Sequence, residues 1–158
     1  MSDPRLEAAI AHWAPRYVEH GVPVGDFLDV TRSIESWDDW CGAWTAAGRV
    51  HEDLGDEALA HGYLRSAGYH YLTAAVEYHF GKFLFCHDID QMRATHELAV
   101  AAHRKAHPLV DPPMERIEFD YLGAHTLVGN LRKPKGIDRP PVVLLIPGLD
   151  SAKEELSG

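Results

Sequence analysis

The sequence predicts an α+β fold in which an all-helical N-terminal part precedes the first strands of an incomplete sheet. From Pro4 to about His107 the apolar residues recur at helical spacing, whereas from Arg116 onward they alternate or run continuously, as in strands. Between the two parts, residues 108–113 contain three prolines in six positions and cannot continue a helix.

This change of period divides the chain into a helical domain (1–107), a proline-rich connector (108–115) and a β-containing segment (116–158). The chain has 158 residues, of which 46 % are hydrophobic and 25 % charged. This composition is that of an ordinary globular protein, so no disulfide or metal is required to stabilise the core. We therefore expect Cys41 and Cys86 to be buried free thiols.

The charge balance argues against two classes of partner. Fifteen Lys and Arg against 24 Asp and Glu give a formal net charge of −9. A nucleic-acid binder would carry a basic face, and a module that binds a membrane surface would carry a polybasic face. Neither nucleic acid nor membrane is therefore expected as a partner. The N-terminus has no secretory signal, and the longest apolar run, Val142 to Pro147, is too short to span a bilayer. We predict a soluble, cytoplasmic protein.

Capping signals place the first helices. Ser2 or Asp3, followed by a proline, begins a helix that stops at Gly21, and a short element follows at about 26–33. Ser36 begins a capping box and opens a helix with tryptophans at 37, 40 and 44. These three indoles fall on one stripe, which we interpret as a core seam.

The glycines at 55, 62 and 68 leave the boundaries of the next helices open. Ser66 is a candidate N-cap for a long helix that ends near Phe85. Asp88 is expected to cap the last helix, which ends at about Ala106.

The β-containing segment begins with a predicted hairpin. Residues 116–122 alternate, Gly123-Ala124 makes a turn, and residues 125–132 return as a second strand. After a polar loop, Val142 to Ile146 is apolar at every position, which is typical of a central parallel strand covered on both faces.

The eleven histidines do not predict a metal site. His61, His70 and His79 are nine residues apart, so successive members would point to opposite faces of a helix. His96 and His103 share a face, but they would lie about 10 Å apart along the axis, too far for one ion. We therefore expect exposed helical histidines and no bound metal.

One short segment has the layout of an oxyanion-hole loop. The apolar strand leads into residues 147–151, Pro-Gly-Leu-Asp-Ser, and then into a helix start. Backbone N–H groups just after such a glycine can stabilise a developing alkoxide, although any strand–turn–helix junction shares this pattern. A G-x-S-x-G nucleophile elbow is absent, because the nearest approach, around Ser66, lacks the first glycine and lies among helices.

Several stretches together resemble one family. Residues 66–75 (SAGYHYLTAA) and 78–85 (YHFGKFLF) are similar to the helical-domain signature of the 2,6-dihydroxypseudooxynicotine hydrolase-like branch of the α/β-hydrolases. Residues 142–155, with PGLDSAKEE at their end, resemble the third core strand and oxyanion loop of that branch. The tryptophan helix and the hairpin at 116–132 fit its cap and first two strands. The chain therefore resembles the N-terminal part of such a hydrolase.

The resemblance implies a serine hydrolase whose helical domain covers the active site. Such an enzyme would cleave a carbon–carbon bond next to a ketone, or an ester, in an aromatic or polyketide-like small molecule, without a metal or organic cofactor. By position, the Leu149 amide would donate to the oxyanion and Gly148 would permit close approach. Tyr78, His79 and Phe83 would line the substrate-facing wall.

In this family the nucleophile, the acid and the catalytic histidine all lie downstream, and this chain contains none of them. We therefore expect the chain alone to be inactive. Its partner would be the remaining hydrolase core, on the same or a separate chain. The alternatives are a non-catalytic helical interaction module and one half of a split hydrolase. An unpaired strand at Val142 to Ile146 also predicts association, including with copies of the same chain.

Overall fold

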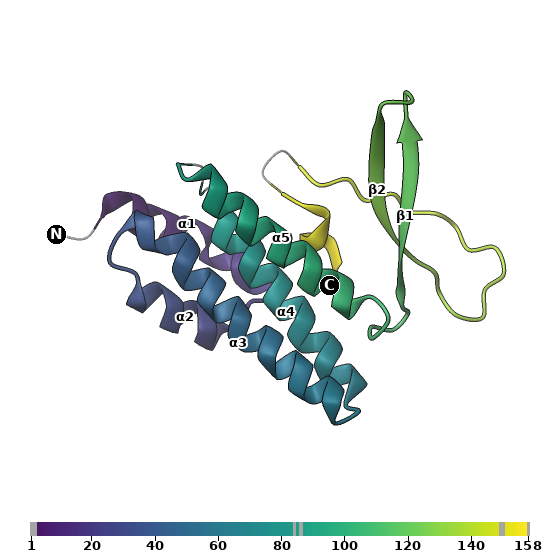
Figure 1. Cartoon of the computed structure of the whole chain (residues 1–158), viewed down its shortest axis with the longest axis horizontal. Coiled ribbons are helices and arrows are strands. Elements are labelled where there is room, and N and C mark those ends of the chain that lie inside the picture. The colour runs from purple at the N-terminus through teal and green to yellow at the C-terminus, as the bar shows by residue number, and fades with distance from the viewer. Residues whose placement is uncertain (1–2, 84, 86, 149–150, 158) are drawn as a thin grey trace.

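The computed structural model describes residues 3–83, 85, 87–148 and 151–157 and confirms the α+β fold. A helical layer makes up most of the molecule, and a β-hairpin stands away from it (Figure 1). In this part of the chain the elements are α1 (Pro4–Glu19), α2 (Val24–Ser33), the 3₁₀ turn η1 (Trp37–Asp39), α3 (Trp40–Ala60), α4 (Leu64–Lys82), α5 (Ile89–Ala106), β1 (Met114–Tyr121), β2 (His125–Arg132) and the 3₁₀ segment η2 (Lys153–Ser157).

The predicted helix ends are largely confirmed. The Asp3 side chain accepts the Arg5 backbone N–H at 2.9 Å, and the chain leaves α1 through Gly21 with φ +99°. Ser2, the other candidate cap, lies outside the described residues. The Asp88 side chain accepts a first-turn N–H of α5, as expected for an N-cap. At η1, the Asp39 carboxylate accepts the Ser36 backbone N–H at 3.0 Å, as a capping box requires.

The boundary between α3 and α4 differs from the prediction at Ser66. Helix α4 begins at Leu64, so Ser66 lies inside its first turn and is not the cap. Of the three glycines left open, only Gly62, with φ +77°, ends a helix. Gly55 and Gly68 are buried inside α3 and α4, where they allow close packing against Tyr71 and Leu109.

Two tyrosines of α4 pack on two glycines of α3. A Cβ added at Gly48 would lie 2.6 Å from the Tyr78 ring, and one at Gly55 would lie 2.7 Å from the Tyr71 ring. The Tyr78 hydroxyl donates to Glu52 Oε2 at 2.8 Å, and the Tyr71 hydroxyl donates to Asp56 Oδ1 at 2.6 Å. Lys105 of α5 joins both carboxylates at 2.9 and 3.0 Å. These contacts define the register of the antiparallel α3–α4 pair.

Aromatic side chains form the core between α1, α3 and α4. Trp40 and Trp44 are 1 % and 0 % exposed, and Trp37 stacks on Trp40, which confirms that the tryptophan stripe is a core seam. Tyr17 stacks on Phe80 with ring centroids 3.7 Å apart. Within this core Cys41 is a buried free thiol, as predicted, whereas Cys86 lies outside the described residues.

The hairpin is antiparallel, as predicted, and begins two residues earlier than the alternating pattern suggests. Met114 pairs with Arg132 and Tyr121 pairs with His125. Leu122 and Gly123 both have positive φ, 54° and 66°, and the Ala124 backbone N–H donates to the Tyr121 carbonyl oxygen at 3.3 Å, which closes the turn. None of the described helices combines the length and the apolar content that a bilayer span requires.

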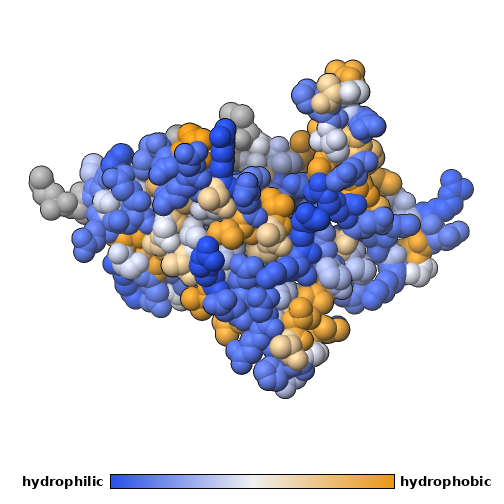
Figure 2. Space-filling model, in the orientation of Figure 1, coloured by the Kyte–Doolittle hydropathy of each residue, from blue (hydrophilic) through white to orange (hydrophobic). Residues whose placement is uncertain are grey.

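The segment Val142 to Ile146 is not the predicted central strand. Its side chains are 64–88 % exposed, and none of the described residues forms a ladder with it. A strand acquires its hydrogen bonds only from a neighbour, and β1 and β2 pair with each other. In Figure 2 apolar surface appears on the hairpin and, in separate patches, over the helical layer.

Candidate functional site

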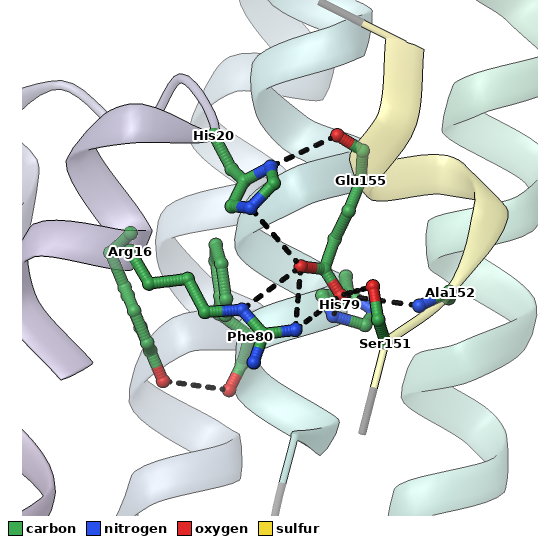
Figure 3. Close-up of polar contacts among 8 residues, drawn as sticks. Arg16, His20, His79, Phe80, Ser151, Ala152 and Glu155 are labelled. Atoms are coloured by element: carbon green, nitrogen blue, oxygen red, sulfur yellow. Dashed lines mark hydrogen bonds and ion pairs between the residues drawn. The ribbon is translucent and has the colours of Figure 1, made fainter. Parts of the chain in front are cut away.

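Segment η2 is held on the helical layer by one buried carboxylate. Glu155 is 4 % exposed, and its Oε2 atom lies 2.9 Å from the Arg16 guanidinium of α1. Its Oε1 atom lies 2.6 Å from His79 Nε2 of α4 and accepts the Ser151 hydroxyl at 2.9 Å. His20 Nδ1, at the end of α1, donates to the Glu155 carbonyl oxygen at 3.1 Å (Figure 3). The segment after the predicted oxyanion loop is therefore tied to two helices.

The electrostatics favour an ionised Glu155. Burial alone would raise its pKa, but His79, Arg16 and Ser151 outweigh burial and lower the pKa to about 2. Burial lowers the pKa of His79, and the neighbouring Glu155 carboxylate offsets that effect only in part. The Arg16 guanidinium places a permanent positive charge 2.9 Å from Glu155 Oε2, and it also lies over the Phe83 ring at 4.7 Å.

A small, partly open cavity lies beside this carboxylate. Its volume is about 180 Å³, and one wall is a stripe of α4 with the helical spacing 69, 72, 73 and 76. The opposite wall comes from the end of α1 and from η2. The lining residues are His20, Gly21, Tyr69, Leu72, Thr73, Val76, Glu154 and Glu155.

The three predicted substrate-facing residues separate into two groups. His79 and Phe83 lie beside Arg16 and Glu155, with their own rings 5.9 Å apart. Tyr78 lies elsewhere, buried against Gly48 with its hydroxyl on Glu52. None of these three described residues lines the cavity, so their role in substrate binding stays a prediction.

The predicted oxyanion loop is described only at its ends. Gly148 is exposed, and its carbonyl oxygen accepts the Ser151 backbone N–H at 3.3 Å. Leu149, the predicted oxyanion donor, lies outside the described residues. Its role therefore stays a prediction.

Sequence reasoning missed Arg16 and Glu155. Arg16 is in the last turn of α1, where a cation is expected to compensate the helix dipole, and Glu155 occupies a first-turn position that favours acids. Each position has an ordinary local explanation. No local signal links two residues that are 139 positions apart.

The expectation of exposed helical histidines is wrong at three positions. His79, His103 and His107 are 2 %, 2 % and 8 % exposed. Ala74 and Ala75 of α4 and Ala99 and Ala102 of α5 belong to one buried cluster at the contact between these helices, together with Tyr78. His103 Nδ1 and His107 Nε2 are 2.9 Å apart, and burial lowers the pKa of His103 to about 4.

A second polar cluster joins α2, α3 and α4. Asp26, His51 and Glu77 each offer a donor atom, and these three atoms all lie within 4.8 Å of one another. This is a donor set that can hold a divalent metal ion, and it was not predicted, because its members come from three helices.

Comparisons with known proteins agree on one family. Residues 22–157 match the family model of FrsA-like esterases. A hydrolase of Aspergillus aculeatus, acrC, is 32 % identical over 155 residues, covering 86 % of this chain and 36 % of its own length. The 2,6-dihydropseudooxynicotine hydrolase of Paenarthrobacter nicotinovorans is 29 % identical over 154 residues, covering 98 % of this chain and 41 % of its own.

The backbone is also similar to a solved structure. The crystal structure of the 2,6-dihydroxy-pseudo-oxynicotine hydrolase superposes with a TM-score of 0.78 at 28 % sequence identity. The match covers 89 % of this chain and 39 % of the solved one. The chain thus spans between about one third and two fifths of the length of the relatives named here.

Proposed function

Because the chain belongs to the FrsA-like esterase family of α/β-hydrolases, we propose that it is the N-terminal portion of a serine hydrolase. Membership confirms the resemblance inferred from the sequence. In this proposal the helical layer covers an active site whose nucleophile, acid and histidine come from the remaining hydrolase core. A backbone oxyanion donor has no attacking group without that core, so the chain alone is expected to be inactive.

The observation that carries the proposal is the seating of η2 on α1 and α4. Glu155 lies only a few residues after Gly148, and Arg16 and His79 hold it at 2.9 and 2.6 Å. A loop that must hold an oxyanion donor within hydrogen-bond reach of substrate needs such rigid support. The helical layer would therefore both cover the substrate and position the loop.

The proposed substrate is an aromatic or polyketide-like small molecule, cleaved at an ester or at a carbon–carbon bond next to a ketone. Tyr69, Leu72 and Val76 provide an apolar wall beside the Glu154–Glu155 pair. The cavity of about 180 Å³ is smaller than the roughly 300–1,000 Å³ of typical ligand pockets. The remaining core would supply the missing wall.

The test is phosphonate labelling combined with the intact mass of the protein from its native source. We expect p-nitrophenyl ester hydrolysis that a serine-directed phosphonate abolishes, and a labelled polypeptide heavier than 17.6 kDa that contains this sequence. The isolated 158-residue chain should neither hydrolyse the ester nor take up the label. Labelling of the isolated chain would contradict the proposal. The Ser151→Ala and Ser66→Ala variants would then locate the modified serine.

The exposed segment Val142 to Ile146 favours one alternative, a split hydrolase. Unpaired backbone and side chains that are 64–88 % exposed are suited to completing a sheet with a second polypeptide. In that case the native mass would be 17.6 kDa, and a separate co-purifying chain would carry the phosphonate. Absence of label from both chains would instead favour a non-catalytic interaction module.

A further inference from the structure

We propose that Asp26, His51 and Glu77 form a binding site for a divalent transition-metal ion, with Zn²⁺ as the representative ion. The site would join α2, α3 and α4, each of which contributes one ligand. The ligand atoms would be Asp26 Oδ2, His51 Nε2 and Glu77 Oε1. This inference does not depend on the proposed hydrolase activity.

The distances between the donor atoms fit a single ion. His51 Nε2 lies 2.8 Å from Asp26 Oδ2 and 3.9 Å from Glu77 Oε1. Ligands bound to zinc at about 2.0–2.2 Å are separated from one another by roughly 3–4 Å. An ion between these three atoms therefore needs only small side-chain movements, and water can complete its coordination.

Glu77 is an independent indication that a cation belongs here. Its side chain is 0 % exposed, and neither carboxylate oxygen has a hydrogen-bond partner among the described residues. A buried carboxylate without donors is costly, and a metal ion removes that cost.

His70 supplies the outer contact that a metal-binding histidine usually has. Its Nδ1 atom lies 3.0 Å from His51 Nδ1, on the opposite side of the His51 ring from the two carboxylates. One ring nitrogen of this pair must carry the hydrogen, and His70 Nδ1 can accept a hydrogen bond from His51 Nδ1–H. This tautomer leaves the lone pair of His51 Nε2 directed at the ion.

The donor chemistry favours a transition ion over Mg²⁺. Imidazole binds Zn²⁺ well and is a poor Mg²⁺ ligand, while two carboxylates balance a divalent charge. Asp26, with 37 % of its side chain exposed, gives the ion a route from solvent. The ion would connect the short helix α2 to the α3–α4 pair.

Isothermal titration of the metal-free 158-residue chain with ZnCl₂ tests the site. We expect one Zn²⁺ per chain, at least tenfold weaker Mg²⁺ binding, and at least tenfold weaker Zn²⁺ binding in Glu77→Gln and His51→Gln. The matched controls are Asp29→Asn on α2 and His61→Gln at the end of α3, both exposed, which should bind as the unmodified chain does.

A second measurement keeps the result independent of folding defects in the variants. Saturating Zn²⁺ should raise the Tm of the unmodified chain and of both controls, but not that of Glu77→Gln, whose circular dichroism should show an intact helical fold. Equal Zn²⁺ affinity in Glu77→Gln and the unmodified chain would overturn the site, since binding would then come from surface histidines. Absence of Zn²⁺ binding, or equal affinity for Mg²⁺, would overturn it as well.

Discussion

Replacement of Glu77 by glutamine should make the fold more stable at alkaline pH and change how its stability depends on pH. The Glu77 side chain is fully buried without a hydrogen-bond partner among the described residues, and burial raises its pKa from 4.5 to about 8. Between these pH values the folded chain retains a proton that the unfolded chain has released. The free energy of unfolding therefore falls as the pH rises through this window.

The pKa difference sets the size of the effect. At about 1.4 kcal/mol per pKa unit, the rise from 4.5 to about 8 corresponds to an upper limit of about 5 kcal/mol. Side-chain relaxation toward solvent near Asp26 reduces this value, so we expect about 2–4 kcal/mol. Glutamine has nearly the same shape and no proton to lose, so the variant should lack this pH-dependent loss of unfolding free energy.

The assay is urea unfolding, followed by tryptophan fluorescence, at pH values from 5 to 9 in EDTA. The difference in unfolding free energy, Glu77→Gln minus unmodified chain, should grow steadily up to about pH 8 and then level off. Taking the difference cancels the contributions of the histidines that titrate in the same range. Asp29→Asn, whose side chain is 82 % exposed, is the control. Parallel stability curves for the Gln variant and the unmodified chain would refute the reasoning.

Three further predictions concern packing and charge. Arg16→Met should lower the unfolding free energy by about 3 kcal/mol in urea titrations, because it removes the guanidinium that pairs with the buried Glu155 carboxylate; an unchanged value would contradict that pairing. Gly48→Ala should lower the unfolding free energy by about 1–3 kcal/mol, since its Cβ would lie 2.6 Å from the Tyr78 ring. The control is Gly42→Ala on the same helix, whose Cβ meets nothing within 4 Å, so this variant should be neutral or stabilising in thermal melting. The pKa of His103 is lowered to about 4, so this residue stabilises the fold above pH 6.5 and loses that contribution as the pH falls toward 4. His103→Gln should therefore flatten the acid side of the curve of unfolding free energy against pH. An unchanged slope would argue against a buried neutral imidazole.

Local signals were sufficient for most of the elements. The caps at Asp3, Ser36 and Asp88 and the hairpin turn at Gly123 depend on residues within a few positions, and the structure has them as expected. Ser66 failed as a cap because the same residue types that cap helices also occur inside a first turn. Helix α4 begins at Leu64, after an N-cap residue, Tyr63, whose side chain makes no capping hydrogen bond.

The parts that depend on contacts distant in sequence could not be predicted. Val142 to Ile146 has the pattern of a buried strand, yet a pattern does not supply the neighbouring strand that would pair with it. The Arg16–Glu155 pair and the Asp26–His51–Glu77 cluster each combine different helices, so no spacing rule within one helix detects them. Histidine spacing within one helix gives no indication of His51, whose partners Asp26 and Glu77 lie on two other helices.

The glycine–tyrosine contacts have a mechanical consequence for the rest of the helical layer. Helices α3 and α4 contact each other closely at two points seven residues apart, where Gly48 packs on Tyr78 and Gly55 packs on Tyr71. Together these two contacts allow only one alignment of α3 against α4. A shift of α3 against α4 by one helical turn would displace the helices by about 5.4 Å. The donor atoms of His51 and Glu77 lie within 4.8 Å of each other, so such a shift would be larger than their separation. Because the two contacts fix the alignment, a residue inserted in the turn at Gly62 should be accommodated within the turn and leave these two side chains together.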